Sequence, residues 1–526
     1  MMRAWEAVVR EMCRLCVPVG SALLVLAAAG CRSPSTANPG DPGEAGGGPP
    51  ASESGPLSAA HPALPGGPNL LVIMADQMRA DHLGVAGHPV VRTPHLDRLA
   101  SEGTRMTHAM APSPSCVPSR QSILTGLWPR NHGARLGDRR IRPGVRTIAE
   151  HLRERGYLTG VFGKMHFRAD EGWHGFDDVI VSMESAGGPR GDYRVWWEER
   201  DLPWTDVDEL SEFGRAGVNP LRAEDFPTSW LTSRFLMWLE GWAREEARRP
   251  FCIWLSYFAP HHPAAPPEPF ASLYDPAEMP MIRGPLDLLE SGESQHLGQS
   301  RRQLEWYKKE GWRRMERDEA SLYRARYGGL VTLLDSQVGR VLAALRRLDL
   351  ERETLVVFVS DHGDFAGEHQ AVTKGPFLLD SLLRVPLIVR LPGRVDAGRE
   401  RSELVSLTDL MPTICELLGV EVPEGLDGSS FAPLLGGEEL AWPDATFGEY
   451  GARGRNQCVN FMVRTHDWKL IDNGTFKGNE QRDELYDLAA DPGELINLSG
   501  LPEYAAVEAE LLQRLELWRA ETSLRP

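Results

Sequence analysis

Five apolar runs, set apart by segments with helical patterning, limit what this chain can fold into. The first, residues 70–74, reads Leu-Leu-Val-Ile-Met, and the others cover residues 157–162, 251–258, 355–359 and 385–389. Uninterrupted apolar runs of this length are typical of strands that a sheet buries on both faces. The runs predict an α/β fold built on one large, mostly parallel or mixed sheet.

Helix signals occupy the intervals between these runs. Thr93 and Pro94 stand where a capping residue and the first residue of a helix belong. Thr147 and Glu150 have the spacing of a capping box. Residues 318–348 carry leucine and valine at helical spacing, as in an amphipathic helix packed on a core. The alternation of strands and helices predicts helices on both faces of the sheet.

Residues 426–526 differ from the alternating region and predict a smaller C-terminal α+β subdomain. Short apolar runs at residues 461–464 and 468–471 suit an antiparallel sheet, and a helical segment follows Pro502. We therefore expect a large domain over residues 69–425 with this subdomain packed beside it.

The amino terminus, residues 1–31, has the features of an export signal. Arginines precede an apolar run at residues 17–30, which is shorter than the roughly 20 residues that a membrane-spanning helix needs. The run ends in Ala-Ala-Gly-Cys and resembles a bacterial lipobox, whose cysteine becomes lipidated; here that cysteine is Cys31. We expect export to the bacterial cell envelope and a lipid anchor at Cys31, with an ordinary signal peptide cut nearby as the alternative.

Residues 32–68 are rich in proline and glycine and predict a flexible tether. Such a segment buries too little apolar surface to offset the entropy of ordering the chain. A tether of this kind suits a folded body held away from a membrane surface.

The charge balance bears on the possible partners. Lys plus Arg total 57 against 74 Asp plus Glu, a net charge of −17. A field of that sign repels phosphate backbones, so we expect no nucleic acid partner. An anionic substrate would need a local cluster of cations or a metal ion. Seven cysteines in 526 residues are too few for a disulfide scaffold.

Polar side chains follow four of the apolar runs, at the point where each predicted strand ends. Open α/β sheets bind ligands in the crevice beyond the carboxyl ends of their strands. We therefore expect these side chains to converge on one edge of the sheet. They are Asp76, Lys164, His166, His261, Asp361 and His362.

The sharpest motif lies at residues 115–126, which read S-C-V-P-S-R-Q-S-I-L-T-G. Pro118 places Cys116 at the N-terminus of a short helix, where the helix dipole favours anions. By itself this could be a buried structural cysteine or a thiolate nucleophile. The pattern C-x-P-S-R-x4-T-G resembles the modification signature of the type I, formylglycine-dependent sulfatases of the alkaline phosphatase superfamily. In that family a formylglycine-generating enzyme oxidises the cysteine to formylglycine.

Further motifs extend the resemblance over roughly residues 69–500. Ala75-Asp76-Gln77 resembles the first metal-binding turn of the family, and Ser360 to Asp364 resembles the second. The others are Gly163 to Phe167 for the G-K-x-H motif, Pro260 to Pro263 for the P-H-x-P motif with His261 and not His262 as the active histidine, Lys374 for the last substrate lysine, and Glu484 to Leu488 for a C-terminal signature.

The resemblance implies one divalent cation at this edge of the sheet. Its ligands would be Asp76, Gln77, a hydroxyl of the modified Cys116, Asp361 and His362. Mostly oxygen ligands favour Ca²⁺, with Mg²⁺ or Mn²⁺ as alternatives. Gln77 stands where many relatives have a second aspartate, and His362 where some have asparagine, which weakens the case for Ca²⁺.

The resemblance also implies the catalytic roles. One hydroxyl of hydrated formylglycine would attack sulfur, and the second would let the covalent sulfate leave. Asp361 would take the proton of the attacking hydroxyl, and His166 would act as base in sulfate release. The remaining cationic or histidine side chains would stabilise charge, hold sulfate and protonate the leaving oxygen. The implied catalytic set is Cys116, Arg120, Lys164, His166, His261, Asp361 and Lys374.

The predicted function is hydrolysis of a sulfate ester, carried by a small molecule or, given the expected envelope location, a sulfated glycan. Residues 163–167 together with His174 are locally similar to choline sulfatases. An aspartate–glutamine turn paired with an aspartate–histidine turn also occurs in relatives that cleave phosphonate monoesters or phosphodiesters with the same formylglycine chemistry. That reaction is the main alternative, and a sugar-binding lipoprotein without catalysis is the third interpretation.

Other residues are predicted to be structural. We expect His132 to pack behind the Cys116 helix rather than to contact substrate, and the aromatic residues near position 195 to pack in the core. These aromatic residues are Tyr193, Trp196 and Trp197, and the expected buried free thiols are Cys252, Cys415 and Cys458.

Overall fold

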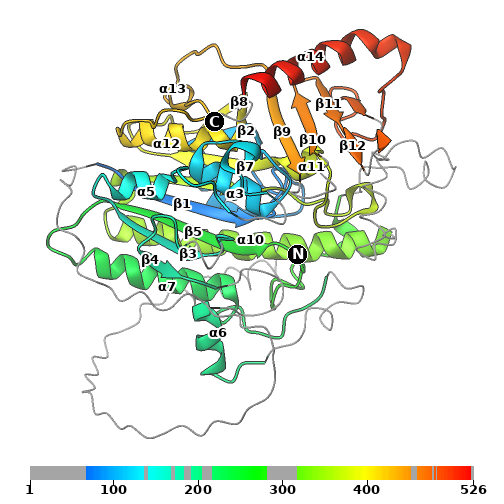
Figure 1. The fold of residues 1–526 in the computed structure, drawn as a ribbon. Coiled ribbons are helices and arrows are strands. Elements are labelled where there is room, and N and C mark those ends of the chain that lie inside the picture. The colour runs from blue at the N-terminus through cyan, green and yellow to red at the C-terminus, as the bar shows by residue number, and fades with distance from the viewer. Residues whose placement is uncertain are drawn as a thin grey trace, which may run out of the picture. The chain divides into compact units, whose positions relative to one another are not determined.

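The structure is a computed structural model of the chain, and it describes residues 67–135, 140–167, 172–182, 191–203, 216–280, 317–451, 459–476, 479–480 and 483–522 (Figure 1). Internal contacts divide the chain into residues 1–59 and residues 60–526. The predicted signal peptide, Cys31, the tether up to residue 66 and Cys458 lie outside the described residues. Among the described helices, none combines the length and the apolar character that crossing a bilayer requires.

Eight strands of the described residues form one sheet, in the order β4-β3-β5-β1-β6-β7-β2-β8. All five predicted runs are strands of this sheet, and β1 is buried along its whole length. The strands are β1 (Asn69–Asp76), β2 (Thr104–Met110), β3 (Leu158–Gly163), β4 (Asp178–Ile180), β5 (Phe251–Pro260), β6 (Thr354–Ser360), β7 (Arg384–Arg390) and β8 (Arg399–Ser406).

The sheet is mixed, which the apolar runs allowed. From β4 across to β6 each strand runs parallel to its neighbours. β7 is antiparallel to both β6 and β2, and β2 is parallel to β8. The apolar runs do not predict β2, β4 and β8, because these strands are partly exposed and mix polar with apolar residues.

Helices cover both faces of the sheet, and each face has its own core (Figure 1). Leu70 and Val72 of β1 pack in the core under α3, α5 and α12, whereas Leu71 and Ile73 pack in the core under α7 and α10. The predicted capping box is present at the start of α5, and the predicted long helix is α10. The helices are α2 (Pro94–Ser101), α3 (Cys116–Thr125), α4 (Pro129–His132), α5 (Ile148–Arg153), α6 (Gly191–Glu198), α7 (Pro227–Trp242), α10 (Arg317–Arg347), α11 (Asp380–Leu383), α12 (Leu410–Leu418), α13 (Ala432–Leu435) and α14 (Ala505–Glu521), with short 3₁₀ helices η1 (Pro276–Glu278), η2 (Glu351–Glu353), η3 (Glu368–Gln370), η4 (Leu407–Asp409) and η5 (Pro502–Tyr504).

The predicted C-terminal antiparallel sheet is also present, and α14 lies across it (Figure 1). Trp518 of α14 stacks on Phe447 with ring centroids 4.7 Å apart, and Leu511 and Leu515 pack into the same small core. The predicted boundary after residue 425 stays a prediction, because residues 60–526 form one unit. In the described residues the sheet order is β14-β11-β10-β9, from β9 (Thr446–Gly451), β10 (Val459–Arg464), β11 (Trp468–Asp472) and β14 (Glu484–Asp487), and β12 (Thr475–Phe476) pairs with β13 (Asn479–Glu480).

Candidate active site

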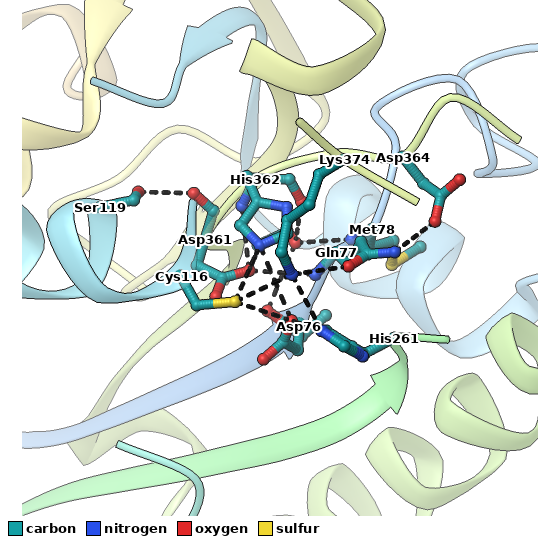
Figure 2. Close-up of polar contacts among 12 residues, drawn as sticks. Asp76, Gln77, Met78, Cys116, Ser119, His261, Asp361, His362, Asp364 and Lys374 are labelled. Atoms are coloured by element: carbon teal, nitrogen blue, oxygen red, sulfur yellow. Dashed lines mark hydrogen bonds and ion pairs between the residues drawn. The ribbon is translucent and has the colours of Figure 1, made fainter. Parts of the chain in front are cut away.

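The carboxyl ends of β1, β3, β5 and β6 meet at one edge of the large sheet, as the sequence predicted. Ala75 of β1 pairs with Ser360 of β6, and Gly163 of β3 pairs with Ser256 of β5. The side chains that follow these positions therefore face a common space, part of which Figure 2 shows. The polar residues at these strand ends are Asp76, Lys164, His166, His261, Asp361 and His362, and all six are buried.

Cys116 is the first residue of α3, and its side chain points into this space (Figure 2). Its sulfur lies 3.0 Å from Lys374 Nζ, 3.1 Å from His362 Nε2 and 3.7 Å from Asp76 Oδ1. Burial raises the pKa of the Cys116 thiol, but the Lys164 and Lys374 ammonium groups outweigh it and leave this pKa well below its ordinary value. The structure thus places the predicted nucleophile position in a field that stabilises negative charge.

Four side chains form a cluster with the donor chemistry of a metal site. Asp76, Cys116, Asp361 and His362 each offer one ligand atom, and these atoms all lie within 4.8 Å of one another. His362 Nδ1 lies 2.8 Å from the carbonyl oxygen of Gly363. A carbonyl can only accept, so Nδ1 carries a proton, and Nε2 is the ring nitrogen that could bind a cation. Two carboxylates and an imidazole nitrogen are ligand types that fit a divalent cation.

Arg120 holds the two carboxylates of this cluster in place. Its guanidinium is fully buried and donates to Asp76 Oδ2 at 2.8 Å and to Asp361 Oδ2 at 2.7 Å. Ser256 Oγ, 2.7 Å from Nη1, completes the support. Because Arg120 occupies one oxygen of each carboxylate, Asp76 Oδ1 is left to face Cys116. The predicted contact of Arg120 with sulfate stays a prediction.

Two lysines bring positive charge to Cys116. Lys164 Nζ lies 2.7 Å from Asp76 Oδ2 and 3.9 Å from the Cys116 sulfur. Lys374 Nζ lies 2.9 Å from His261 Nε2. Burial and these two ammonium groups lower the pKa of His261 to about 3, so the imidazole is neutral at pH 7. Lys374 therefore donates its proton in the hydrogen bond to His261.

Gln77 contributes a carboxamide whose two ends have different partners. Lys374 Nζ donates to Gln77 Oε1 at 2.8 Å, and Gln77 Nε2 donates to Asp364 Oδ2. His262 Nδ1 lies 3.2 Å from the same Nε2. Gln77 has a positive φ of 67°, which turns the chain sharply after β1. The carboxamide oxygen therefore lies on the Lys374 side, as the predicted ligand role requires.

Sequence reasoning did not assign a role to several residues of the site. Ser119 Oγ donates to the carbonyl oxygen of Asp361 at 2.5 Å, and Tyr327 Oη donates to that of Gln77 at 2.7 Å. Asp364 contacts Gln77. Ser119 and Asp364 stand inside recognised motifs, so their positions carried a signal. Tyr327 comes from α10, and nothing in the sequence connects it to this edge of the sheet.

The histidines near the site divide into two kinds. The His166 side chain interacts with the Cys116 thiol, and its backbone has a positive φ of 62°. His132 is fully buried beside α3, where its Nε2 lies 3.1 Å from Ser122 Oγ and 3.1 Å from the Pro118 carbonyl oxygen. Burial lowers the pKa of His132 to about 3. The predicted packing role of His132 is confirmed.

The residues predicted to be structural behave as expected where the structure describes them. Tyr193 is fully buried and stacks on Trp196 with centroids 5.6 Å apart. Trp197 packs against the same core from its edge. Cys252 and Cys415 are buried free thiols, and burial raises the pKa of Cys252 above its ordinary range.

Comparisons with known proteins identify the family of this chain. A sulfatase family model matches residues 68–420, and a model described as the C-terminal part of N-sulphoglucosamine sulphohydrolase matches residues 367–521. An arylsulfatase of Clostridium perfringens is 30% identical over 83% of this chain and 91% of its own length. A choline-sulfatase of Rhizobium meliloti is 29% identical, covering 85% of each chain.

The fold is shared with solved structures. A phosphonate monoester hydrolase of Agrobacterium radiobacter superposes with a TM-score of 0.74 at 27% identity, over 86% of this chain and 96% of the other. The sulfatase family model spans the large sheet and its strand-end residues. This chain therefore belongs to the sulfatase family of sulfuric ester hydrolases, within the alkaline phosphatase superfamily.

Proposed function

We propose that this chain hydrolyses a sulfate ester with a formylglycine made from Cys116 by a formylglycine-generating enzyme. The observation that carries the proposal is the position of the Cys116 sulfur, which is one of the converging ligand atoms of the metal cluster and lies 3.0 Å from Lys374 Nζ. The sulfur stands where a hydroxyl of hydrated formylglycine would lie. Such a diol would supply one hydroxyl to attack sulfur and a second whose deprotonation expels sulfate and restores the aldehyde.

One divalent cation would be held by Asp76, Gln77, residue 116, Asp361 and His362. The donor set fits, because Arg120 satisfies one oxygen of each carboxylate and the carbonyl of Gly363 fixes the imidazole tautomer. When bound, the cation would polarise the attacking hydroxyl and neutralise sulfate oxygens. Ca²⁺ is the first candidate, with Mg²⁺ and Mn²⁺ as alternatives.

The side chains around Cys116 have roles that follow from their protonation. Lys374 carries a proton and is positioned to donate it to the leaving oxygen, while the neutral His261 accepts from it and holds it in place. Lys164 would stabilise charge on the sulfate and on residue 116. Asp361 would accept the proton of the attacking hydroxyl, and His166 would act as base in sulfate release.

The proposal is tested by sulfate release from an aryl sulfate, with protein produced together with a formylglycine-generating enzyme. We expect turnover that a chelator abolishes and that a divalent cation restores. Cys116→Ala should abolish this turnover. Cys252→Ala is its matched control, because Cys252 is also a buried free thiol but lies outside the cluster. Full turnover in protein whose Cys116 stays a thiol would contradict the proposed mechanism.

A second candidate reaction is hydrolysis of a phosphonate monoester or phosphodiester at the same site. Gln77 and His362 at the metal turns favour it, as does the structural similarity to the Agrobacterium radiobacter enzyme. The ratio of turnover on an aryl sulfate to turnover on a matched aryl phosphonate monoester separates the two reactions. A ratio far above one supports the sulfatase, and a ratio far below one supports the alternative.

We further propose that the natural substrate is a sulfated glycan met at the cell envelope. The match of residues 367–521 to the C-terminal model of N-sulphoglucosamine sulphohydrolase supports an amino-sugar substrate, and the predicted lipobox at Cys31 supports the location. The choline-sulfatase relative makes choline sulfate the competing substrate. Parallel assays with sulfated glucosamine and with choline sulfate distinguish the two, and labelling with radioactive palmitate tests the lipid anchor.

A further inference from the structure

The orientation of the Gln77 carboxamide is fixed by partners of opposite kinds. An ammonium group can only donate, so Lys374, at 2.8 Å, requires an oxygen at its end of the amide. An ionised carboxylate can only accept, so Asp364 requires the NH₂ group at the other end. If the amide were reversed, its NH₂ group would face the Lys374 ammonium and its oxygen would face the Asp364 carboxylate. Such a mismatch costs a few kcal/mol for buried groups. Figure 2 shows both contacts.

Asp364 is itself held rigidly. Its Oδ1 accepts from the backbone N–H of Ala366 at 2.6 Å and of Thr373 at 3.0 Å. Its Oδ2 accepts from Tyr323 Oη at 2.9 Å and from Gln77 Nε2. The four donors take up the lone pairs of a carboxylate that is 0% exposed. These four contacts prevent the Asp364 carboxylate from turning away from Gln77.

The loop that carries Asp364 is fixed as well. Arg79 Nη1 donates to the carbonyl oxygens of Asp364 at 2.9 Å and of Phe365 at 3.2 Å. The same guanidinium pairs with the carboxylate of Glu368 at 3.0 Å. Arg79, two residues after Gln77, thus connects the first metal-binding turn to the loop that follows the second one.

We propose that Asp364 is a positioning residue for the metal site. It presents the Gln77 oxygen, and not its NH₂ group, to the cation, and it places next to Gln77 the negative charge that a glutamine lacks. This inference rests on the proposed cation site. In this view Gln77 and Asp364 act as one unit. Gln77 provides the ligand atom for the cation, and Asp364, behind it, provides the charge.

The pair can be inverted without changing its size or its total charge. Asp364→Asn removes the charge and one acceptor, and Gln77→Glu places a second carboxylate against Asp364. We expect each single change to weaken cation affinity about 10- to 100-fold, the range typical of lost support to a metal ligand. In the double variant the asparagine NH₂ donates to the new glutamate, so affinity recovers most of the loss.

The readout is the dissociation constant of Ca²⁺ and of Mn²⁺, measured by chelator competition on folded protein, with aryl sulfate turnover recorded alongside. Asp335→Asn is the matched control. Asp335 is equally buried, but it caps α2 through the backbone N–H groups of His95 and Leu96, at 3.1 and 2.8 Å. This control should lower the free energy of unfolding and leave cation affinity unchanged.

The outcomes separate this inference from the proposed function. Recovery in the double variant supports the inference, and the recovery itself shows that Asp364→Asn does not act by unfolding. Additive losses in the double variant, with a wild-type protein that binds the cation, overturn the inference alone. Cation binding by Gln77→Glu that is as tight as in wild type overturns it equally. A wild-type protein that binds neither cation overturns the proposed cation site together with the inference.

Discussion

This molecule contains two clusters of buried charged residues, which are built from similar residue types but have different roles. At the active site, Asp76, Asp361 and His362 direct ligand atoms toward one another and toward Cys116. At the junction between the large sheet and the antiparallel sheet, Lys469 instead lies between Asp380 and Glu494. In the junction cluster each charge has an opposite partner in direct contact.

The two clusters differ in how their carboxylate oxygens are used. In the junction, Arg464 donates to both oxygens of Asp380, and Glu494 accepts from Lys469 with one oxygen and from the backbone N–H of Asp380 with the other. At the active site Arg120 takes only one oxygen of Asp76. A buried cluster whose charges are all paired needs no further ion, and removing one partner is costly, whereas converging ligand atoms offer a cation a binding site.

The largest effect should come from Cys116→Ala. Without the residue that becomes formylglycine, turnover should fall by about 10³-fold or more, while the melting temperature stays close to that of wild type. Initial rates on an aryl sulfate and a thermal melt check both statements. A variant that keeps more than a tenth of wild-type activity would show that residue 116 does not take part in the reaction.

The two lysines give the sharpest contrast between the clusters. Lys374→Met removes the proton donor beside Cys116 and should lower kcat about 10²- to 10³-fold, with little change in the free energy of unfolding. Steady-state kinetics and urea unfolding on the same sample measure the two quantities. A loss of stability with an unchanged kcat would show that Lys374 stabilises the fold, as we expect of Lys469, and does not act in catalysis.

Lys469→Met should have the opposite profile. Lys469 is 0% exposed, and its loss leaves Asp380 and Glu494 with less compensation. We expect the free energy of unfolding to fall by about 3–5 kcal/mol, the usual cost of removing one partner of a buried ion pair. Cation affinity and kcat should not change at temperatures where the variant is folded. Urea titration and chelator competition test this, and a selective loss of kcat would show that the junction serves catalysis.

The smallest effect is a pH dependence of the junction. Burial raises the pKa of Glu494 from 4.5 to about 7, in spite of Lys469. Between these values the folded protein holds a proton that the unfolded chain has lost, so the Glu494 contribution to stability is present below pH 4.5 and declines as pH rises toward 7. Glu494→Gln should flatten the stability profile over that range in urea titrations at about pH 5, 6 and 7. An unchanged slope would show that Glu494 is ionised in the folded protein.

Much of the fold was predictable, because its central strands are buried on both faces and leave continuous apolar runs such as residues 70–74 and 355–359. The edge strands β4 and β8 left no such signal, since their polar residues face water. The strand-end rule located Asp76, Asp361 and His362 correctly, because topology alone brings those positions together.

The contacts between motifs could not be predicted. Arg120 was expected near residue 116, and the structure places its guanidinium on the two carboxylates. The support of Gln77 by Asp364 depends on how the loops after β1 and β6 pack against each other, which no spacing along the chain encodes. The segments at 185–230 and 265–315, where we expect substrate specificity, lie partly outside the described residues.

Mass spectrometry of the peptide that contains residue 116, from protein purified out of its native host, is the decisive measurement. Conversion of Cys116 to formylglycine replaces the thiol by an aldehyde, which changes the peptide mass and reacts with an aldehyde-specific label. We predict conversion in the active fraction of the protein. An active preparation in which residue 116 remains a thiol would contradict the diol mechanism and require a cysteine nucleophile in its place.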